Sequence, residues 1–308
     1  MMRLLSWIPE NKLCHSPLNM NENAIDYIKQ NGIIISIGLI SFNPGAICFL
    51  NDPKYVYYSS LAKNYNAIQI IKKHIHSFSK FDLTQLSANP NALYLLTLEN
   101  INWKIICQNT NPRAIELIKE NIDNKSLLIT ELCWERLSEN PGAIDFILEY
   151  PEQIIWPLLC KNPHPKALQM IKQKLKEEYM DQIKRNMTEA EIIEYRRKIE
   201  YDQPKDKIII SKLCNNTNPD VLEILESRKE NINWNILCLN PIAIKMLQQN
   251  QDRIKWYWLS FNPSIFEYDY DTMAKERMTL LREELMMKTL HPSRIEKWLE
   301  AGLSIDDL

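Results

Sequence analysis

The chain has 308 residues, of which 45% are apolar and 25% charged, and its formal net charge is −2. This length is enough for one or two folded cores, and the composition is that of a folded protein, which excludes a disordered chain. A net charge this small provides no long-range field to attract nucleic acid or an acidic membrane surface. The sequence has no apolar run of 18 residues, so it predicts no membrane span.

The numbers of glycines and cysteines further limit the kinds of protein that this chain can be. The chain has only five glycines, and neither the dinucleotide-binding nor the P-loop motif occurs. Both motifs need glycine where the backbone approaches a phosphate, so we expect no nucleotide cofactor. The cysteines number seven, an odd count with no Cys-x-x-Cys pair. This usage indicates reduced thiols and a cytoplasmic location.

Residues 1–20 match no repeat, and we expect them to cap one end of the fold. From Asn21 onward the chain repeats a unit of the form N-P-x-A-I-x-x-L, followed by a Trp-x-x-Leu segment. The units start at Asn21, Asn43, Asn64, Asn89, Asn111, Asn140, Asn162, Asn218, Asn240 and Asn262. Five of the nine intervals between these starts are 22 residues long, so the chain is predicted to be a repeat protein.

Each unit reads as a pair of short helices. Asparagine before proline is driven into the extended backbone state of an N-cap, and proline suits the first helical position. The alanine, isoleucine and leucine that follow form one apolar stripe, and the alanine indicates a close helix crossing. The second helix carries the tryptophan and ends near serine or cysteine. Two such helices cannot bury their stripes alone, so the units must stack.

The regular pattern covers residues 21–171 and 208–271. Between them, residues 172–207 hold 10 basic and 9 acidic side chains. Thr188 and Glu191 are spaced as a capping box, so we expect a charged helical hairpin here. The long interval after Asn111 contains residues 122–131, where we expect a longer loop or an extra helical turn.

After residue 271 the pattern changes, and residues 272–308 are expected to form a C-terminal helical cap. Residues 272–290 are predicted to form one long amphipathic helix, followed by a shorter helix from Pro292 that Gly302 closes. The predicted fold is therefore all-α: an α-solenoid of about ten helix-pair repeats of about 22 residues, with a charged helical insertion and a cap at each end.

The units resemble short repeats in largely uncharacterised proteins of giant, mimivirus-like DNA viruses. The resemblance covers roughly residues 21–308, and "HPSRIEKWLEAGLSIDDL" is similar to a closing segment of some of those proteins. Glu22 and Tyr65 replace the proline, and a His-Pro is inserted after Asn162. The resemblance implies a viral setting but no chemistry for any residue.

The isolated histidine and cysteine motifs favour structural roles over metal-binding or catalytic ones. His74 and His76 lack a nearby cysteine or acidic partner at metal-ligand spacing. Five cysteines, near the ends of second helices, are interpreted as buried core residues: Cys107, Cys133, Cys160, Cys214 and Cys238. His164 is the nearest histidine to Cys160, which makes a weak catalytic pair. The sequence thus predicts no catalytic, cofactor-binding or metal residue and no cofactor.

Acidic and aromatic motifs lead to the same conclusion. Residues 267–271, "EYDYD", lack the register of a calcium loop and indicate a solvated turn. Five tryptophans could stack on RNA bases, but their place on the apolar stripe favours the core: Trp103, Trp134, Trp156, Trp234 and Trp256.

The expected function is that of a non-enzymatic scaffold or adaptor that binds another protein, viral or host, in the host cytoplasm, the viral factory or the virion. The alternative is an RNA- or ribonucleoprotein-binding repeat protein, which needs a basic track that the evenly mixed charge disfavours. An enzyme is not expected.

Overall fold

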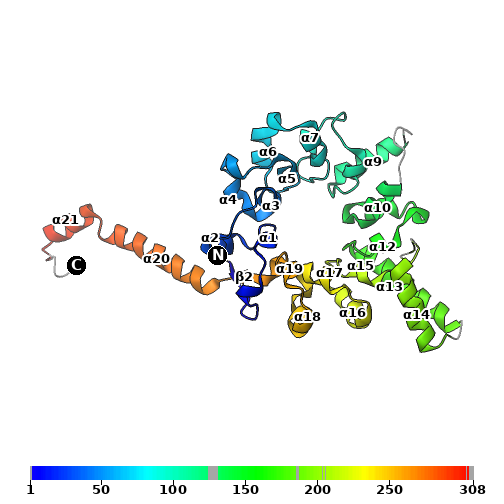
Figure 1. Ribbon diagram of the computed structural model, residues 1–308. Helices are drawn as coiled ribbons and strands as arrows, with labels where there is room; N and C mark the ends of the chain where they lie inside the picture. Colours follow the sequence, from blue (N-terminus) through cyan, green and yellow to red (C-terminus); the bar gives the residue numbers. More distant parts are fainter. Residues whose placement is uncertain are drawn as a thin grey trace.

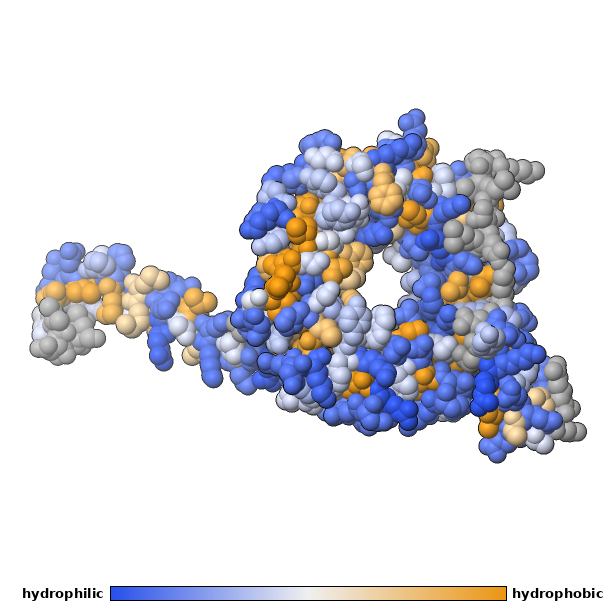
Figure 2. Space-filling view, in the orientation of Figure 1, coloured by the Kyte–Doolittle hydropathy of each residue, from blue (hydrophilic) through white to orange (hydrophobic). Residues whose placement is uncertain are grey.

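The computed structural model describes residues 2–302, except 124–130, 185–186, 203 and 205, together with residue 304. The fold is mostly helical, and the helices are arranged in a ring (Figure 1). In the space-filling view an opening passes through the middle of this ring (Figure 2). The C-terminal helices extend away from it as an arm (Figure 1).

Short helices alternate with single 3-10 turns around the ring. The α-helices are α1 (His15–Leu18), α2 (Ile25–Gln30), α3 (Ile37–Phe42), α4 (Ile47–Leu50), α5 (Tyr58–Leu61), α6 (Ile68–His74), α7 (Lys80–Leu86), α8 (Trp103–Ile106), α9 (Pro112–Asp123), α10 (Glu131–Glu139), α11 (Ile144–Ile147), α12 (Trp156–Leu159), α13 (Pro165–Lys184), α14 (Glu189–Asp202), α15 (Ile210–Leu213), α16 (Val221–Glu226), α17 (Trp234–Leu239), α18 (Ile244–Gln249), α19 (Trp256–Leu259), α20 (Tyr270–Thr289) and α21 (Pro292–Glu300). The 3-10 turns are η1 (Glu10–Lys12), η2 (Pro44–Ala46), η3 (Pro53–Tyr55), η4 (Ile75–Ser77), η5 (Leu93–Leu95), η6 (Pro141–Ala143), η7 (Pro151–Gln153), η8 (Lys229–Asn231), η9 (Pro241–Ala243), η10 (Gln251–Arg253) and η11 (Pro263–Ile265). Strands β1 (Met2–Leu4) and β2 (Phe266–Tyr268) form the sheet.

A circular series of buried asparagines connects neighbouring units. In each, the side-chain amide donates two hydrogen bonds of 2.7–3.2 Å: one to the backbone carbonyl of the previous asparagine in the series and one to the carbonyl two residues before that. These ladder asparagines, all 0–3% exposed, are Asn21, Asn43, Asn64, Asn89, Asn109, Asn140, Asn162, Asn216, Asn240 and Asn262. Because both hydrogens of each amide find a carbonyl, these hydrogen bonds offset the cost of burying the amide.

The expected capping role of the asparagine is confirmed. In each ladder asparagine the side-chain oxygen accepts the N–H of the second residue on, at 2.8–3.2 Å. The unit that opens at Asn43 shows the expected cap, with Pro44 at the first helical position of η2. One asparagine therefore starts its own unit and binds the preceding one.

Two predicted unit starts, Asn111 and Asn218, cap the turn that follows as expected, since their side-chain oxygens accept the N–H groups of Arg113 and Asp220, but they do not belong to the ladder. Asn109 and Asn216 occupy the ladder, not Asn111 and Asn218. The intervals next to them become 20 and 31 residues, and 54 and 24. The sequence "NTNP" offers two asparagines, and only the first lies three residues after the buried leucine or isoleucine that ends the preceding helix.

In seven of the ten units the second residue after the ladder asparagine lies against a carbonyl of the preceding unit. Where it is asparagine, its amide donates to that carbonyl at 2.8–3.1 Å, as at Asn23, Asn66, Asn91, Asn111 and Asn218. Where it is glycine, the backbones lie closer still. A Cβ on Gly45 would collide with the carbonyl oxygen of Glu22, and one on Gly142 would lie 2.8 Å from that of Thr110.

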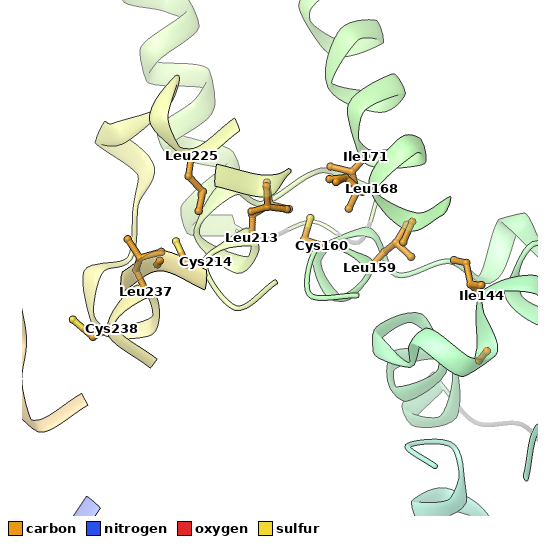
Figure 3. Packing of buried hydrophobic residues seen from close by; sticks show 14 of the residues in the cluster. Ile144, Leu159, Cys160, Leu168, Ile171, Leu213, Cys214, Leu225, Leu237 and Cys238 are labelled. Atoms are coloured by element: carbon orange, nitrogen blue, oxygen red, sulfur yellow. The ribbon is translucent and has the colours of Figure 1, made fainter. Parts of the chain in front are cut away.

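The apolar core follows the ladder around the ring. The third residue before each ladder asparagine is fully buried: Leu18, Ile40, Leu61, Leu86, Ile106, Leu137, Leu159, Leu213, Leu237 and Leu259. Figure 3 shows three of them passing from α12 to α15 and α17, each followed by a buried cysteine. The unit alanines are buried as expected, for example Ala46, Ala143 and Ala243.

The two ends of the chain together complete one unit. Residues 2–4 pair antiparallel with residues 266–268, with Arg3 opposite Glu267. The N–H of Cys14 donates to Ser260 Oγ, as Tyr57 donates to Ser41 Oγ elsewhere in the ring. Thus η11 supplies the first part of this unit, and η1 and α1 supply its second. The expected cap over residues 1–20 is therefore corrected: this segment closes the ring, because the ladder leaves no open end beside it.

The insertion extends a unit without a break at residue 172, because α13 crosses that boundary as one helix. The predicted capping box at Thr188 is confirmed: its N–H donates to Glu191 and its Oγ1 accepts the Glu191 N–H. Helix α14 then leads back towards α15 (Figure 1). The expectation for residues 122–131 falls largely outside the described residues.

The C-terminal helices form where predicted but do not cover the ring, and α20 is not amphipathic as expected, because its apolar side chains are spread around the helix. Neither α20 nor α21, both described in full, has a buried residue. Gly302 has φ +93, as a helix-closing glycine should. The expected cap over residues 272–308 is thus corrected to an exposed arm, because the ring has no open end for it to cover.

Candidate functional site

A cavity of about 600 Å³ lies between the insertion and the ring. We call it the insertion cavity, and it is lined by Ile193, Arg196 and Arg197 of α14, Ser211 of α15, residues 230–235 and Lys255. Its volume falls within the range of ordinary ligand pockets, about 300–1,000 Å³. The cavity exists only because α14 packs beside the ring.

Local structure orients these side chains. Ile193, Arg196 and Arg197 are three and four residues apart on α14, so they share one helix face. On the opposite wall, Asn233 caps α17 by accepting the N–H of Ile236 at 3.2 Å. This cap fixes Trp234, the first residue of α17, at the edge of the cavity.

Positive charge dominates the lining. Arg196, Arg197 and Lys255 face a single acidic residue, Glu230. The Arg196 Nη1 atom lies 4.0 Å from Glu230 Oε1, at the limit of an ion pair. Arg197 pairs along its own helix with Glu194 at 3.1 Å, where both side chains are exposed. An exposed pair of this kind contributes little, so the arginine remains available to a ligand.

A smaller cavity lies on another side of Arg196, and polar and apolar residues line it in equal number. Glu178, Gln182, Arg196, Arg228 and Asn231 line this second cavity. Burial raises the pKa of the Glu178 carboxyl, although nearby Lys207 and Lys174 oppose the shift. Burial lowers the pKa of Arg228, and the positive charge of Arg196 adds to this effect. Arg196 therefore stands between the two cavities with a second cation below it.

The inner helices form another surface. In Figure 1, α12, α17 and α19 border the opening, whereas α16 and α18 lie outside them. Two cavities, of about 360 and 470 Å³, lie elsewhere in the ring and are lined by residues on or just after α1, α3, α5, α7, α8 and α10. Their shared residues are Phe42, Lys63 and Gln85, which mix apolar, basic and polar character. The charged residues that line these two cavities, Lys63 and Arg136, are both basic.

The isolated motifs are placed in structural settings. His74 ends α6 and packs against Tyr58, with ring centroids 6.0 Å apart, while His76 is exposed in η4. His164 Nδ1 accepts the N–H of Lys166 at the start of α13. Across the described ranges, no three histidine, cysteine or acidic side chains gather as a metal site.

The five cysteines named from the sequence are all buried. Burial and the neighbouring Cys133 thiol raise the pKa of Cys107, and the hydrogen bond with Cys133 is the larger cause. Cys160 is fully buried, whereas His164 serves as a helix cap. A buried thiol with a raised pKa is a poor nucleophile.

The acidic cluster at residues 267–271 binds the other end of the chain. Arg3 Nε lies 3.0 Å from Glu267 Oε1, and Arg3 Nη1 lies 3.8 Å from Asp269 Oδ1. Asp269 also caps α20 by accepting the N–H of Thr272, and its hydrogen bonds with Thr272 lower its pKa. The cluster thus helps to close the ring. No pattern in the sequence indicates Arg3 as its partner, because the two segments lie more than 260 residues apart.

The unit tryptophans are half-buried and pack on the core. Lysines lie over two of their rings: Lys174 Nζ is 4.9 Å from the Trp156 ring centroid, and Lys12 Nζ is 4.9 Å from that of Trp256. Trp234 alone among the unit tryptophans lines the insertion cavity within the described structure. The core interpretation of these residues therefore holds only in part, because each retains an exposed edge.

Comparison with known proteins gave no match to a family model, a curated protein or a solved structure. No helix within the described ranges combines the length and apolar character needed to cross a bilayer. The geometry of the chain's own residues must therefore support any assignment of function.

Proposed function

We propose that the chain is a closed α-solenoid that acts as a non-enzymatic scaffold or adaptor and binds another protein at the insertion cavity. The observation that carries this proposal is the cavity itself, which an added helix forms with two units of the ring. The repeated residues support the proposal because their asparagine, alanine and leucine side chains are buried in packing and are not available to a partner. The exposed residues vary between units, so they can provide specificity for a partner.

The resemblance to repeats of giant, mimivirus-like viruses leads us to propose a viral or host protein as the partner. We propose that the two proteins bind in the host cytoplasm, in the viral factory or in the virion. These assignments rest on the resemblance alone.

An RNA- or ribonucleoprotein-binding role is the second candidate. Arg196, Arg197 and Lys255 beside Trp234 combine cations with an aromatic ring, as in single-strand binding sites. These cations are confined to one cavity that also contains Glu230, and the whole chain has a net charge of −2. A protein partner is therefore the better proposal.

The test is to remove α14 without disturbing the core. Leu175 is buried on α13 and Ile208 is buried after the insertion, so the replacement should begin after the first and end before the second. A variant with residues 176–206 replaced by a Gly/Ser linker is compared with the full chain in affinity purification from infected or expressing cells. Quantitative mass spectrometry reports the captured proteins, and circular dichroism reports folding.

We expect the variant to remain helical, to melt cooperatively and to lose its principal partner. Retention of every partner would place the binding surface elsewhere on the ring. If the variant unfolds, Arg197→Glu replaces it in the same experiment, because this exposed side chain cannot be needed for the core. The second candidate would be favoured if RNA is captured, remains bound after washes that remove bound proteins, and is lost in Arg197→Glu.

A further inference from the structure

The insertion cavity is a local cluster of positive charge on a slightly acidic protein. Three cations and one carboxylate line it, whereas the chain as a whole has a net charge of −2. Two of the cations come from the insertion, and the third, Lys255, comes from the ring. A ligand that contacts all three cations would therefore contact both the insertion and the ring.

The protein itself satisfies the Arg196 guanidinium only in part. Its side chain is only 27% exposed, yet its nearest carboxylate oxygen is 4.0 Å away. Its Nε atom is buried and has no hydrogen-bond partner among the described residues. Arg228, whose positive charge also acts on this site, lies below it. A partly desolvated guanidinium whose ion pair with Glu230 is as long as 4.0 Å is stabilised further by a second carboxylate that can reach it.

An apolar surface lies beside these cations. Ile193 is 45% exposed on α14, and Trp234 is half-buried at the start of α17. Both line the same cavity as Arg196. A ligand that carries carboxylates and a neighbouring apolar side chain therefore matches both parts of the lining.

From this lining we infer that the insertion cavity binds a short acidic segment of a protein partner. Its carboxylates contact Arg196, Arg197 and Lys255, and an apolar side chain rests on Trp234 and Ile193. The inference rests on the proposed function and names the chemistry of the partner. An acidic peptide fits better than RNA because the cations form a single cluster, whereas RNA needs a track of them along its phosphates.

The test begins with peptides and needs no knowledge of the natural partner. The full chain is used to select from a displayed library of random peptides, and the best binder is synthesised and measured by fluorescence anisotropy. We expect selected peptides to share aspartate or glutamate beside an apolar residue. We expect affinity to fall as salt concentration rises.

Charge reversal then locates the binding site. Arg197→Glu combined with Lys255→Glu should weaken the selected peptide by about tenfold or more, as expected for two charge contacts. Arg282→Glu on α20 makes the same type of change on the exposed arm and should alter affinity by less than about twofold. The reversed double variant should instead prefer a peptide in which lysines replace the acidic residues. Melting curves confirm that all variants fold.

Three outcomes overturn the inference: selection of peptides without acidic residues, acidic peptides that bind the double variant unchanged, or an RNA oligonucleotide that displaces the peptide and needs the same cations. A partner lost on removal of α14, together with non-acidic selected peptides, would retain the proposed function and reject only its acidic chemistry. If acidic peptides bind at the cavity but every cellular partner is still captured after removal of α14, the acidic chemistry of the cavity is retained and the proposed function is rejected.

Discussion

The side-chain amide of Asn21 donates a hydrogen bond to the backbone carbonyl of Asn262, 2.8 Å away, although 241 residues separate them in the chain. The same amide also reaches the Ser260 carbonyl at 3.1 Å. Both bonds have the geometry found between consecutive ladder asparagines, so the first and last of them are neighbours. An open stack would instead leave these groups unpaired at its two edges.

Closure of the ring predicts a specific cross-link. Arg3 and Glu267 are directly opposite on the antiparallel strands β1 and β2, a spacing that a disulfide can bridge. The double variant Arg3→Cys, Glu267→Cys should form this bond under mild oxidation and melt at a higher temperature. Peptide mapping by mass spectrometry identifies the bond. Arg3→Cys with Lys245→Cys serves as the control, and equal cross-linking in both would reject the closed ring.

The ladder predicts a sharp contrast between two adjacent asparagines. Asn216 is fully buried and donates to the carbonyls of Cys160 and Asn162, whereas Asn215 is exposed. Asn216→Ala should lower the free energy of unfolding by about 3 kcal/mol, because it leaves buried carbonyls without donors. Asn215→Ala should change it by less than about 0.5 kcal/mol. Urea unfolding followed by circular dichroism measures both, and similar values would contradict the ladder.

Two glycines should respond to alanine in opposite directions. A Cβ at Gly45 would collide with the backbone carbonyl of Glu22, whereas one at Gly38 of α3 meets nothing within 4 Å. Gly45→Ala should therefore destabilise the protein by about 1–3 kcal/mol, as forced overpacking does. Gly38→Ala should stabilise it by about 0.5–1 kcal/mol, because alanine favours a helix. Thermal melts of the two variants test the close approach of units, and a stabilised Gly45→Ala would disprove it.

Glu178 predicts a pH dependence with a defined sign. Burial raises the pKa of its carboxyl above the ordinary value of 4.5, so the folded state holds this proton more tightly than the unfolded state. The contribution of Glu178 to stability is therefore full below 4.5 and is lost as pH rises through the raised pKa. In Glu178→Gln this loss cannot occur. The melting temperature of the variant, relative to the wild type, should rise from acidic to neutral pH, and a constant difference would refute the shift.

The sequence by itself determined the unit and the positions of its core. The spacing of Asn43, Pro44 and Ala46 predicted a capped helix start and a buried alanine, and both are present. Thr188 and Glu191 likewise predicted the start of α14. Signals of this kind are visible in one stretch of chain because capping and helix periodicity act over a few residues.

Only the tertiary structure decided that the units close into a ring. Nothing local in Asn21 or Asn262 distinguishes the end of an open stack from a neighbour in a closed one, because small rotations between units add up around the whole ring. The choice between Asn109 and Asn111 for the ladder also depends on carbonyls in the preceding unit. The insertion cavity brings Arg196 and Lys255 together from segments 59 residues apart, and only the packing of α14 beside α17 decides that meeting.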